Sequence, residues 1–174
     1  PIGSRGLGDV YKRQFVTFSE NVPFYGYMMI NGDDKNIKKI AKRISRTQIT
    51  FGESKKCNYQ IRNISSLNGK QNFEIFENKN KKTHKFKINL PGKHNVFNAA
   101  ASIGVAMEEG IPIRHIKKGI YSFTGVGRRY EKHRIKIDSK KFILIDDYGH
   151  HPLEIESNIN AYKEEYPKKK VCMI

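Results

Sequence analysis

The segment from Phe86 to Gly110 constrains the fold more than any other part of the sequence, because it joins a strand, a tight turn and a helix. Apolar residues alternate with polar ones up to Leu90, as in a half-buried strand, and Pro91-Gly92 then turns the chain. An alanine-rich stretch with helical spacing follows, and Gly110 ends it. A strand that leads directly into a helix is typical of α/β proteins.

The turn between this strand and helix carries three polar side chains, those of His94, Asn95 and Asn98. The first N–H groups of a helix are unpaired, and its dipole favours negative charge there. The residues alone leave two interpretations open. In one, Asn95 is the N-cap and His94 a turn residue. In the other, they contact a nucleotide, whose base and ribose match the donors and acceptors of an amide.

The net charge of +16 at first suggests a polyanionic partner, and a basic nucleic-acid-binding module is one alternative. However, the lysines are scattered, and the densest groups, Lys79 to Lys82 and Lys168 to Lys170, lie in expected turns. The sequence has no arginine-rich tract, zinc-finger spacing or aromatic RNA-binding motif. We therefore interpret the charge mainly as a solvated surface and expect no nucleic-acid partner.

The composition also bears on the compartment. Cys57 and Cys172 are far apart and lack metal-ligand spacing, so reduced thiols are expected. No apolar run approaches the length of a membrane span. We expect a cytoplasmic protein that does not contact membranes.

Residues 1–14 differ in character from the rest. The run from Ser4 to Gln14 reads as the in-frame translation of a sequencing-library adaptor, so we exclude it from the expected fold. A first domain is then expected over 15–131. Its apolar runs at 25–30 and 48–51 predict two parallel strands that flank a helix, with Asp33 as the N-cap.

An antiparallel meander is expected between 59 and 90, because short alternating strands flank the turn Asn68-Gly69. Pro112 is expected to open a second helix that Phe123 closes. After the glycine-containing segment 124–127 come Arg128 and Arg129, which either face solvent or clamp a phosphate.

A second, truncated domain is expected over 132–174. It begins with a hairpin, and the loop Asp146 to Pro152 lies between the second strand and a helix. Loops at the carboxyl ends of strands are common ligand sites in α/β proteins. Val171 to Ile174 is expected to start a further strand. A metal-dependent hydrolase that uses Asp146 or Asp147 with His150 and His151 is a less favoured alternative, because no second ligand group lies at suitable spacing.

Four motifs occur in order along the chain and together resemble the Mur ligase family, particularly its alanine-adding members. They are Asn21-Val-Pro-Phe-Tyr-Gly26, Leu90-Pro-Gly-Lys-His-Asn-Val-Phe-Asn98, Phe123-Thr-Gly-Val-Gly-Arg-Arg129 and Asp146-Asp-Tyr-Gly-His-His-Pro152. The resemblance covers residues 15–174. It implies an α/β fold comprising an incomplete central ATP-binding domain, with parallel strands and a meander, followed by the start of a Rossmann-like C-terminal domain.

The resemblance also implies a reaction. It is an ATP-dependent amide ligation of peptidoglycan synthesis, in which the carboxylate of UDP-N-acetylmuramate becomes an acyl phosphate that the amine of L-alanine attacks. Such chemistry depends on positioning and on neutralising phosphoryl charge, so cations and Mg²⁺ contribute most. The substrates would be small molecules.

The resemblance assigns roles to eight residues. His94, Asn95 and Asn98 would hold the adenine and ribose end of ATP, and Arg128 or, preferably, Arg129 would reach its phosphates. Asp147 would contact the nucleotide, while Tyr148 and His150 would face the reacting carboxylate and the amine. The implied catalytic residues are thus Arg129, Tyr148 and His150, and the implied nucleotide-binding residues are His94, Asn95, Asn98, Arg128, Arg129 and Asp147.

One family feature is missing from the sequence. Gly69-Lys70 and Gly92-Lys93 both lack the preceding glycine and following hydroxyl of a phosphate loop. In the family, that loop and the main Mg²⁺ ligands lie upstream, so we expect a fragment with no metal ligands of its own. We expect it to bind ATP no tighter than roughly millimolar and to turn over no substrate alone.

Overall fold

The computed structural model describes residues 4–174; residues 1–3, which belong to the predicted adaptor-derived segment, lie outside the described residues. The described chain forms two compact units. The first comprises residues up to Arg62 with Glu74–His84 and Ala100–Ile111, and the second comprises Asn63–Phe73, Lys85–Ala99 and Pro112–Ile174. The expected domain limits at residues 14 and 131 differ from this division and stay predictions.

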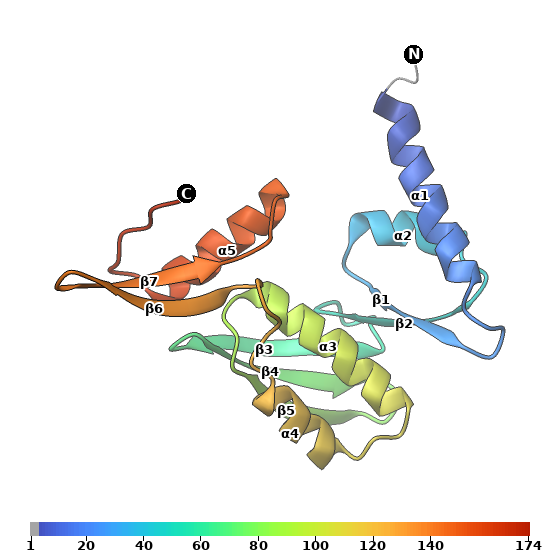
Figure 1. The fold of residues 1–174 in the computed structure, drawn as a ribbon. Coiled ribbons are helices and arrows are strands. Elements are labelled where there is room, and N and C mark those ends of the chain that lie inside the picture. Colours follow the sequence, from blue (N-terminus) through green and yellow to red (C-terminus); the bar gives the residue numbers. More distant parts are fainter. Residues whose placement is uncertain (1–3) are drawn as a thin grey trace. The chain divides into compact units, whose positions relative to one another are not determined.

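Five helices and seven strands alternate along the described part of the chain (Figure 1). The helices are α1 (Ser4–Glu20), α2 (Lys35–Ala41), α3 (Lys93–Glu108), α4 (Ile113–Ser122) and α5 (Pro152–Glu165). The strands are β1 (Tyr27–Asn31), β2 (Thr47–Gly52), β3 (Tyr59–Leu67), β4 (Lys70–Glu77), β5 (Lys82–Ile88), β6 (Glu131–Ile137) and β7 (Lys140–Asp146). No helix of the described residues is long and apolar enough to cross a membrane.

The strands form a five-stranded sheet in the order β1-β2-β3-β4-β5 and a two-stranded sheet of β6 and β7. β1 pairs with β2 in parallel from Tyr27↔Thr47 to Asn31↔Phe51, which confirms the predicted strand–helix–strand unit. β2 also pairs in parallel with the first residues of β3, a pairing that the sequence did not predict. At the predicted hairpin turn, Asn68 and Gly69 both have positive φ, as a two-residue turn of this kind requires.

The N-cap of α2 is Asp34, so the prediction of Asp33 was wrong by one residue. The Asp34 carboxylate accepts hydrogen bonds from the backbone N–H groups of Asn36 and Ile37. The Asp33 carboxylate instead accepts hydrogen bonds from the backbone of Glu53 (2.5 Å) and Ser54 (3.1 Å). Adjacent aspartates compete for such a cap, and here the loop after β2 engages the first of them.

In the first unit, α3 packs closely on the strands. A Cβ at Gly104 would lie 2.7 Å from the end of the Met29 side chain and 3.3 Å from Tyr59, so any side chain there would have to displace that methionine. The phenols of Tyr27 and Tyr59 donate hydrogen bonds to the carboxylates of Glu109 (2.8 Å) and Glu108 (2.7 Å). These two bonds fix the end of α3, where acidic side chains are otherwise unfavourable.

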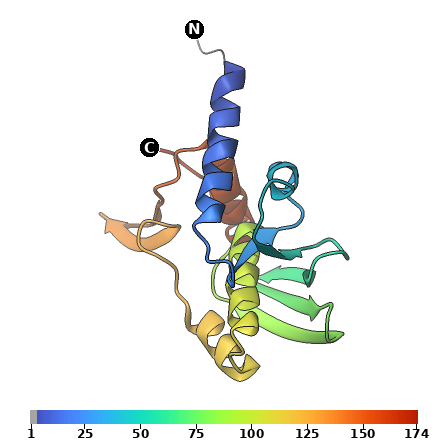
Figure 2. The ribbon, with the colours of Figure 1, turned by 90° about the vertical axis from the view of Figure 1, so that its right-hand side faces the viewer.

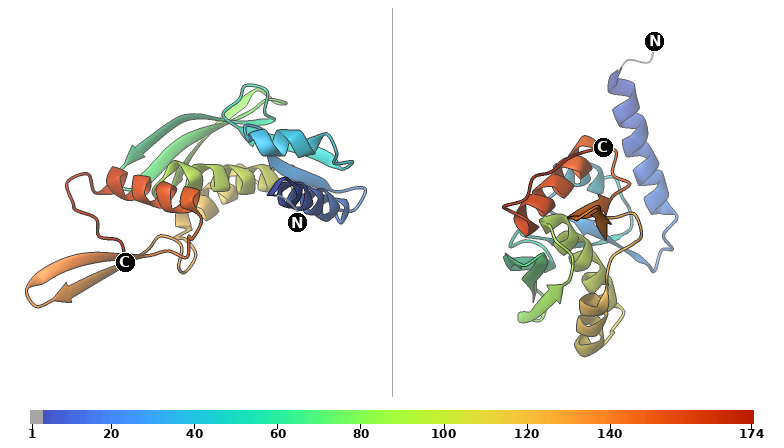
Figure 3. Two further views of the ribbon diagram at one scale, coloured as in Figure 1. Left: turned by 90° about the horizontal axis from the view of Figure 1, so that it is seen from above. Right: turned by 60° about the vertical axis from the view of Figure 1, so that its left-hand side comes forward.

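The second unit contains the start of α3, the helices α4 and α5, and the hairpin. As predicted, α4, which is gold in Figure 2, follows Pro112, and Phe123 is its C-cap. β6 and β7 pair in antiparallel fashion from Glu131↔Asp146 to Ile137↔Lys140 and form a ribbon of their own (Figure 3). The expected strand at Val171–Ile174 is absent from the structure. A strand needs a neighbour for its backbone hydrogen bonds, and none of the described strands pairs with this segment.

Candidate functional site

The turn before α3 is held by its own backbone and by Asn95. Because α3 begins at Lys93, Asn95 lies in the first helical turn and is not the N-cap, so that interpretation was wrong. Its side-chain amide donates a hydrogen bond to the carbonyl of Pro91 (2.7 Å), and its backbone N–H donates to that of Gly92 (3.1 Å). Asn95 therefore fixes the entry into the helix, while Asn98 lies exposed one turn further on.

Gly92 brings the turn into contact with α5. Its φ of +87° lies in the left-handed region. A Cβ here would lie 2.8 Å from Cε1 of His94 and 3.1 Å from Cβ of Ala161, a residue that is fully buried in α5. The absence of a side chain at Gly92 thus allows the His94 ring and α5 to approach the same backbone.

His94 is half-buried beside this contact. Burial lowers the pKa of its imidazole below the ordinary value of 6.5, and the nearby negative charge of Asp147 acts in the opposite direction. Burial is the larger of the two effects. The ring is therefore neutral at pH 7, with one nitrogen as a donor and the other as an acceptor.

Asp147 joins the segment after α4 to the loop after β7. One carboxylate oxygen accepts a hydrogen bond from the backbone N–H of Tyr130 (2.7 Å), and the other accepts from that of Gly149 (2.7 Å). A Cβ at Gly149 would lie 2.6 Å from the second oxygen. Hydrogen bonds to an ionised acceptor are among the stronger ones, so this carboxylate fixes both segments.

The backbone around the two arginines is strained. Arg128 and Tyr130 both have positive φ, at 57° and 51°, which is unusual for residues other than glycine. The N–H of Arg128 donates to Glu131 (2.8 Å), and its carbonyl accepts from the N–H of Tyr148 (2.8 Å). These bonds and that of Asp147 compensate for the conformational cost.

The two arginine side chains point to different carboxylates. Nε of Arg128 lies 3.8 Å from Asp146, and its guanidinium lies 5.4 Å from the centre of the Tyr148 ring. Nη1 of Arg129 lies 3.8 Å from Glu154. All four charged side chains of these two pairs are at least 42% exposed, so each pair contributes little to stability.

Tyr148 and His150 are neighbours on the surface, with their rings edge to face at 5.6 Å. His151 is the N-cap of α5: its Nδ1 accepts a hydrogen bond from the backbone N–H of Leu153 (3.3 Å), and Glu154 completes a capping box. A histidine engaged in this way is not placed to ligate a metal. Together with the engaged oxygens of Asp147, this contact argues against the metal-dependent hydrolase.

No group of three or more His, Cys, Asp or Glu side chains that could hold a metal ion occurs among the described residues. His94, Asp147 and both arginines belong to one compact unit. Within it, the structure brings the turn of His94 and the loop of Asp147 together, because these two side chains interact electrostatically. For all eight residues, the roles that the resemblance implies stay predictions.

Sequence reasoning missed three residues of the site. Tyr130 is buried behind the arginines, Glu154 pairs with Arg129, and Ala161 contacts Gly92. A glutamate three residues after a possible N-cap was a detectable signal for Glu154. Nothing in the local sequence marks Tyr130 or Ala161, because their importance depends on contacts that are distant along the chain.

Comparison with known families identifies the chain. A model of the Mur ligase middle domain matches residues 7–106, which is more than half of the sequence. The chain belongs to the Mur ligase family. The match begins inside the segment that we attribute to an adaptor, and that segment forms part of α1.

Curated Mur ligases are similar over almost the whole chain. The UDP-N-acetylmuramate–L-alanine ligase of Psychrobacter sp. (strain PRwf-1) is 36% identical over 167 residues, which cover 95% of this chain and 35% of that protein. The enzyme of the same name from Vesicomyosocius okutanii subsp. Calyptogena okutanii (strain HA) is 38% identical over 164 residues, which cover 94% of this chain and 35% of that protein. The chain thus spans about a third of the length of these relatives, in agreement with the expected fragment.

Solved Mur ligases share the fold. The crystal structure of MurF from Acinetobacter baumannii matches with a TM-score of 0.74 at 22% identity, and the match covers 94% of this chain and 35% of the MurF chain. The structure of UDP-N-acetylmuramate-alanine ligase MurC from Thermotoga maritima matches with a TM-score of 0.67 at 25% identity, and the match covers 88% of this chain and 41% of the MurC chain. The expected α/β fold of a Mur ligase, with parallel and antiparallel strands, is confirmed.

The contact at Gly92 predicts a specific cost for added bulk in this Mur ligase chain. Gly92→Ala and Gly110→Ala both place alanine at a positive φ, but a Cβ at Gly110 meets nothing within 4 Å. We expect Gly110→Ala to cost about 1 kcal/mol of unfolding free energy through backbone strain, and Gly92→Ala about 2 kcal/mol more through steric overlap. Urea denaturation followed by circular dichroism measures both. Equal losses in the two variants would contradict the contact.

The lowered pKa of His94 predicts a pH dependence of stability. Because the folded pKa lies below 6.5, the unfolded chain binds more protons, and stability falls as the pH drops through about 6.5. The loss of stability ends once the pH is below the pKa of His94 in the folded chain. We expect the urea midpoint of His94→Gln to fall less steeply than that of the unmodified chain between about pH 7.5 and about pH 5. Identical slopes for the two proteins would show that the imidazole is not desolvated.

Proposed function

We propose that this chain is part of a cytoplasmic ATP-dependent ligase that joins L-alanine to UDP-N-acetylmuramate in peptidoglycan synthesis. The observation that carries the proposal is the name shared by the two curated relatives, which are 36% and 38% identical over nearly all of the chain. Because the chain spans about a third of those proteins, the activity is proposed for the whole parent protein.

The turn before α3 fits the adenosine end of ATP. His94 is neutral and offers one donor and one acceptor, and Asn98 adds an exposed amide one turn later. The side-chain nitrogen of Asn95 is engaged with Pro91, so its role is to hold the turn and to offer its carbonyl oxygen. When bound, ATP would supply the phosphoryl group that activates the carboxylate as an acyl phosphate.

Arg129 is the better candidate for a phosphate contact. Both arginine pairs are 3.8 Å long and half-exposed, and a phosphate can replace either of them with two parallel hydrogen bonds. The guanidinium of Arg128 additionally lies 5.4 Å from the centre of the Tyr148 ring, and its backbone N–H donates to Glu131. We therefore assign Arg129 to neutralise phosphoryl charge and Arg128 to support the segment.

Asp147 acts chiefly by position in this proposal. Both of its oxygens accept backbone hydrogen bonds, although a carboxylate oxygen can accept a second one from a bound nucleotide. Tyr148 and His150 remain exposed at the end of β7, where they would face the substrate carboxylate and the amine of L-alanine. Because the family resemblance implies that the main Mg²⁺ ligands lie upstream, we assign them to other parts of the parent protein.

The adenosine assignment predicts weak binding by this chain alone. Adenosine is uncharged, so its binding reports the turn and not the general basicity of the protein. We expect a Kd of roughly millimolar, with NMR amide shifts concentrated at 92–98, and a severalfold loss in His94→Ala. The control His115→Ala, on the exposed face of α4, should bind like the unmodified chain. Adenosine shifts that are unchanged by His94→Ala would refute this assignment.

The ligase assignment is testable by exchange of the matched segment. Residues 15–174 replace the corresponding part of the Psychrobacter ligase, and phosphate release is measured with ATP, UDP-N-acetylmuramate and L-alanine. We expect release that requires both substrates. Arg129→Gln should lower kcat/KM about a hundredfold by removing charge stabilisation, whereas Arg114→Gln on α4 should change it less than about twofold. A cooperatively folded chimera without alanine-dependent release would overturn the proposal.

A further inference from the structure

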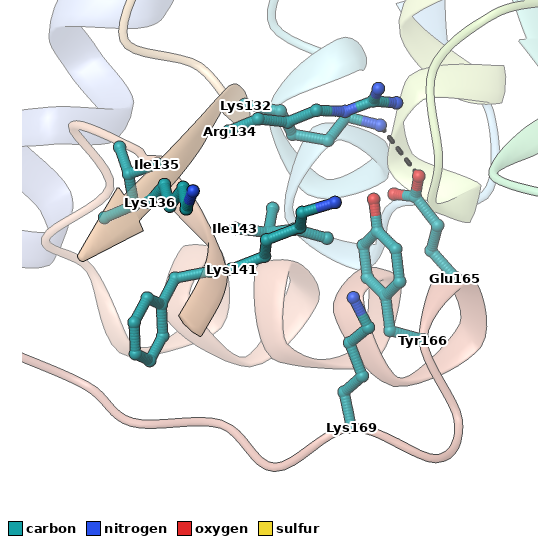
Figure 4. A pocket seen from close by; sticks show the side chains of 10 residues that line it. Lys132, Arg134, Ile135, Lys136, Lys141, Ile143, Glu165, Tyr166 and Lys169 are labelled. Atoms are coloured by element: carbon teal, nitrogen blue, oxygen red, sulfur yellow. Dashed lines mark hydrogen bonds and ion pairs between the residues drawn. The ribbon is translucent and has the colours of Figure 1, made fainter. Parts of the chain in front are cut away.

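A cavity of about 830 Å³ lies between the hairpin and the end of α5 in the second unit. Five cationic side chains and one carboxylate line it: Lys132, Arg134, Lys136, Lys141, Lys169 and Glu165. Figure 4 shows the charged ends of Arg134, Lys141 and Lys169 directed toward the space beside the Tyr166 ring. None of these residues belongs to the proposed nucleotide site.

The hairpin register concentrates this charge on one face. Lys132, Arg134 and Lys136 alternate along β6, so their side chains leave the same face of the ribbon. Lys141 of β7 lies directly opposite Lys136 in the antiparallel pairing. Like charges directly opposite each other destabilise a hairpin. The arrangement therefore has a cost that a bound anion would remove.

The single carboxylate of the cavity neutralises only one of the cations. Glu165 is 2.8 Å from Nζ of Lys132 and also accepts a hydrogen bond from the phenol of Tyr130 (3.4 Å). Lys169 lies over the Tyr166 ring at 5.1 Å. In the part of the chain that the structure describes, no carboxylate forms an ion pair with the three remaining cations, Arg134, Lys136 and Lys141.

We propose that this cavity binds a small inorganic or organic polyphosphate through its phosphate groups. Concave sites of this size take small ligands, and several convergent cations suit a ligand with several negative charges. A single-stranded nucleic acid would need a free aromatic surface for stacking. The Tyr166 ring is already contacted by the Lys169 ammonium and by the Tyr162 ring at 5.3 Å. Phe142 is the other aromatic side chain of the lining and is 45% exposed, so at most one base could stack there. The five cations therefore favour a ligand held through its phosphate charge.

The test uses inorganic tripolyphosphate and isothermal titration calorimetry at low ionic strength, where surface charges are least screened. We expect one site per chain with a Kd in the micromolar range, about −7 to −8 kcal/mol. The double variant K136Q/K141Q should bind at least about tenfold more weakly, because it removes two charges from the cavity wall. Tripolyphosphate should also raise the Tm of the unmodified chain more than that of this variant.

The matched control is K117Q/K118Q, which removes the same charge from two exposed positions of α4. It should bind tripolyphosphate within about twofold of the unmodified chain. Equal weakening in both double variants would mean that only net charge matters and would overturn the proposal. So would an oligonucleotide that displaces tripolyphosphate at equal phosphate concentration. Competition by adenosine would place the anion at the turn before α3 and would likewise refute a separate cavity.

Discussion

The carboxylate of Asp147 is the interaction on which the arrangement of the site depends. It lies at the end of a strand and accepts two backbone hydrogen bonds, one from the segment that carries the arginines and one from its own loop. Without it, the left-handed backbone at Arg128 and Tyr130 would lose a strong compensating bond. The same negative charge faces His94. One side chain thus relates three segments that are far apart in the sequence.

The site contains polar groups of two kinds. Asp147, Asn95 and His151 use their hydrogen-bonding atoms within the chain, and their function is to fix backbone. Arg129 and Tyr148 are exposed and weakly held. A ligand that replaces weak exposed contacts loses little stability, whereas one that displaced Asp147 would release two loops. This difference separates the residues that fix the backbone from those that we propose for ligand contacts.

Local signals in the sequence predicted much of the fold. Asn68-Gly69 predicted a hairpin turn and Pro112 predicted a helix start, because these residues favour particular backbone conformations by themselves. The prediction of Asp33 as the cap of α2 and the interpretation of Asn95 as an N-cap were wrong, because adjacent polar residues compete for a cap and the surrounding loop decides which of them forms it. The prediction of a strand at Val171–Ile174 was wrong, because a strand depends on a neighbour, which a run of apolar residues cannot supply.

The residues of the site, like the fold, could be predicted from the sequence only in part. The family motifs marked His94, Asp147 and the arginines, but not Tyr130 or Ala161, whose contributions depend on contacts across the unit. Sequence spacing also could not show that the oxygens of Asp147 are already engaged. That fact follows only from the positive φ of Tyr130 and the tight turn at Gly149.

The two oxygens of Glu154 serve different partners. Oε2 accepts from the backbone at the start of α5, while Oε1 faces Arg129. Backbone hydrogen bonds hold the pKa of this carboxyl below its usual range, with a smaller contribution from the arginine. The glutamate is therefore anchored independently of its cationic partner. Loss of the contact with Arg129 would therefore leave the capping box of α5 in place.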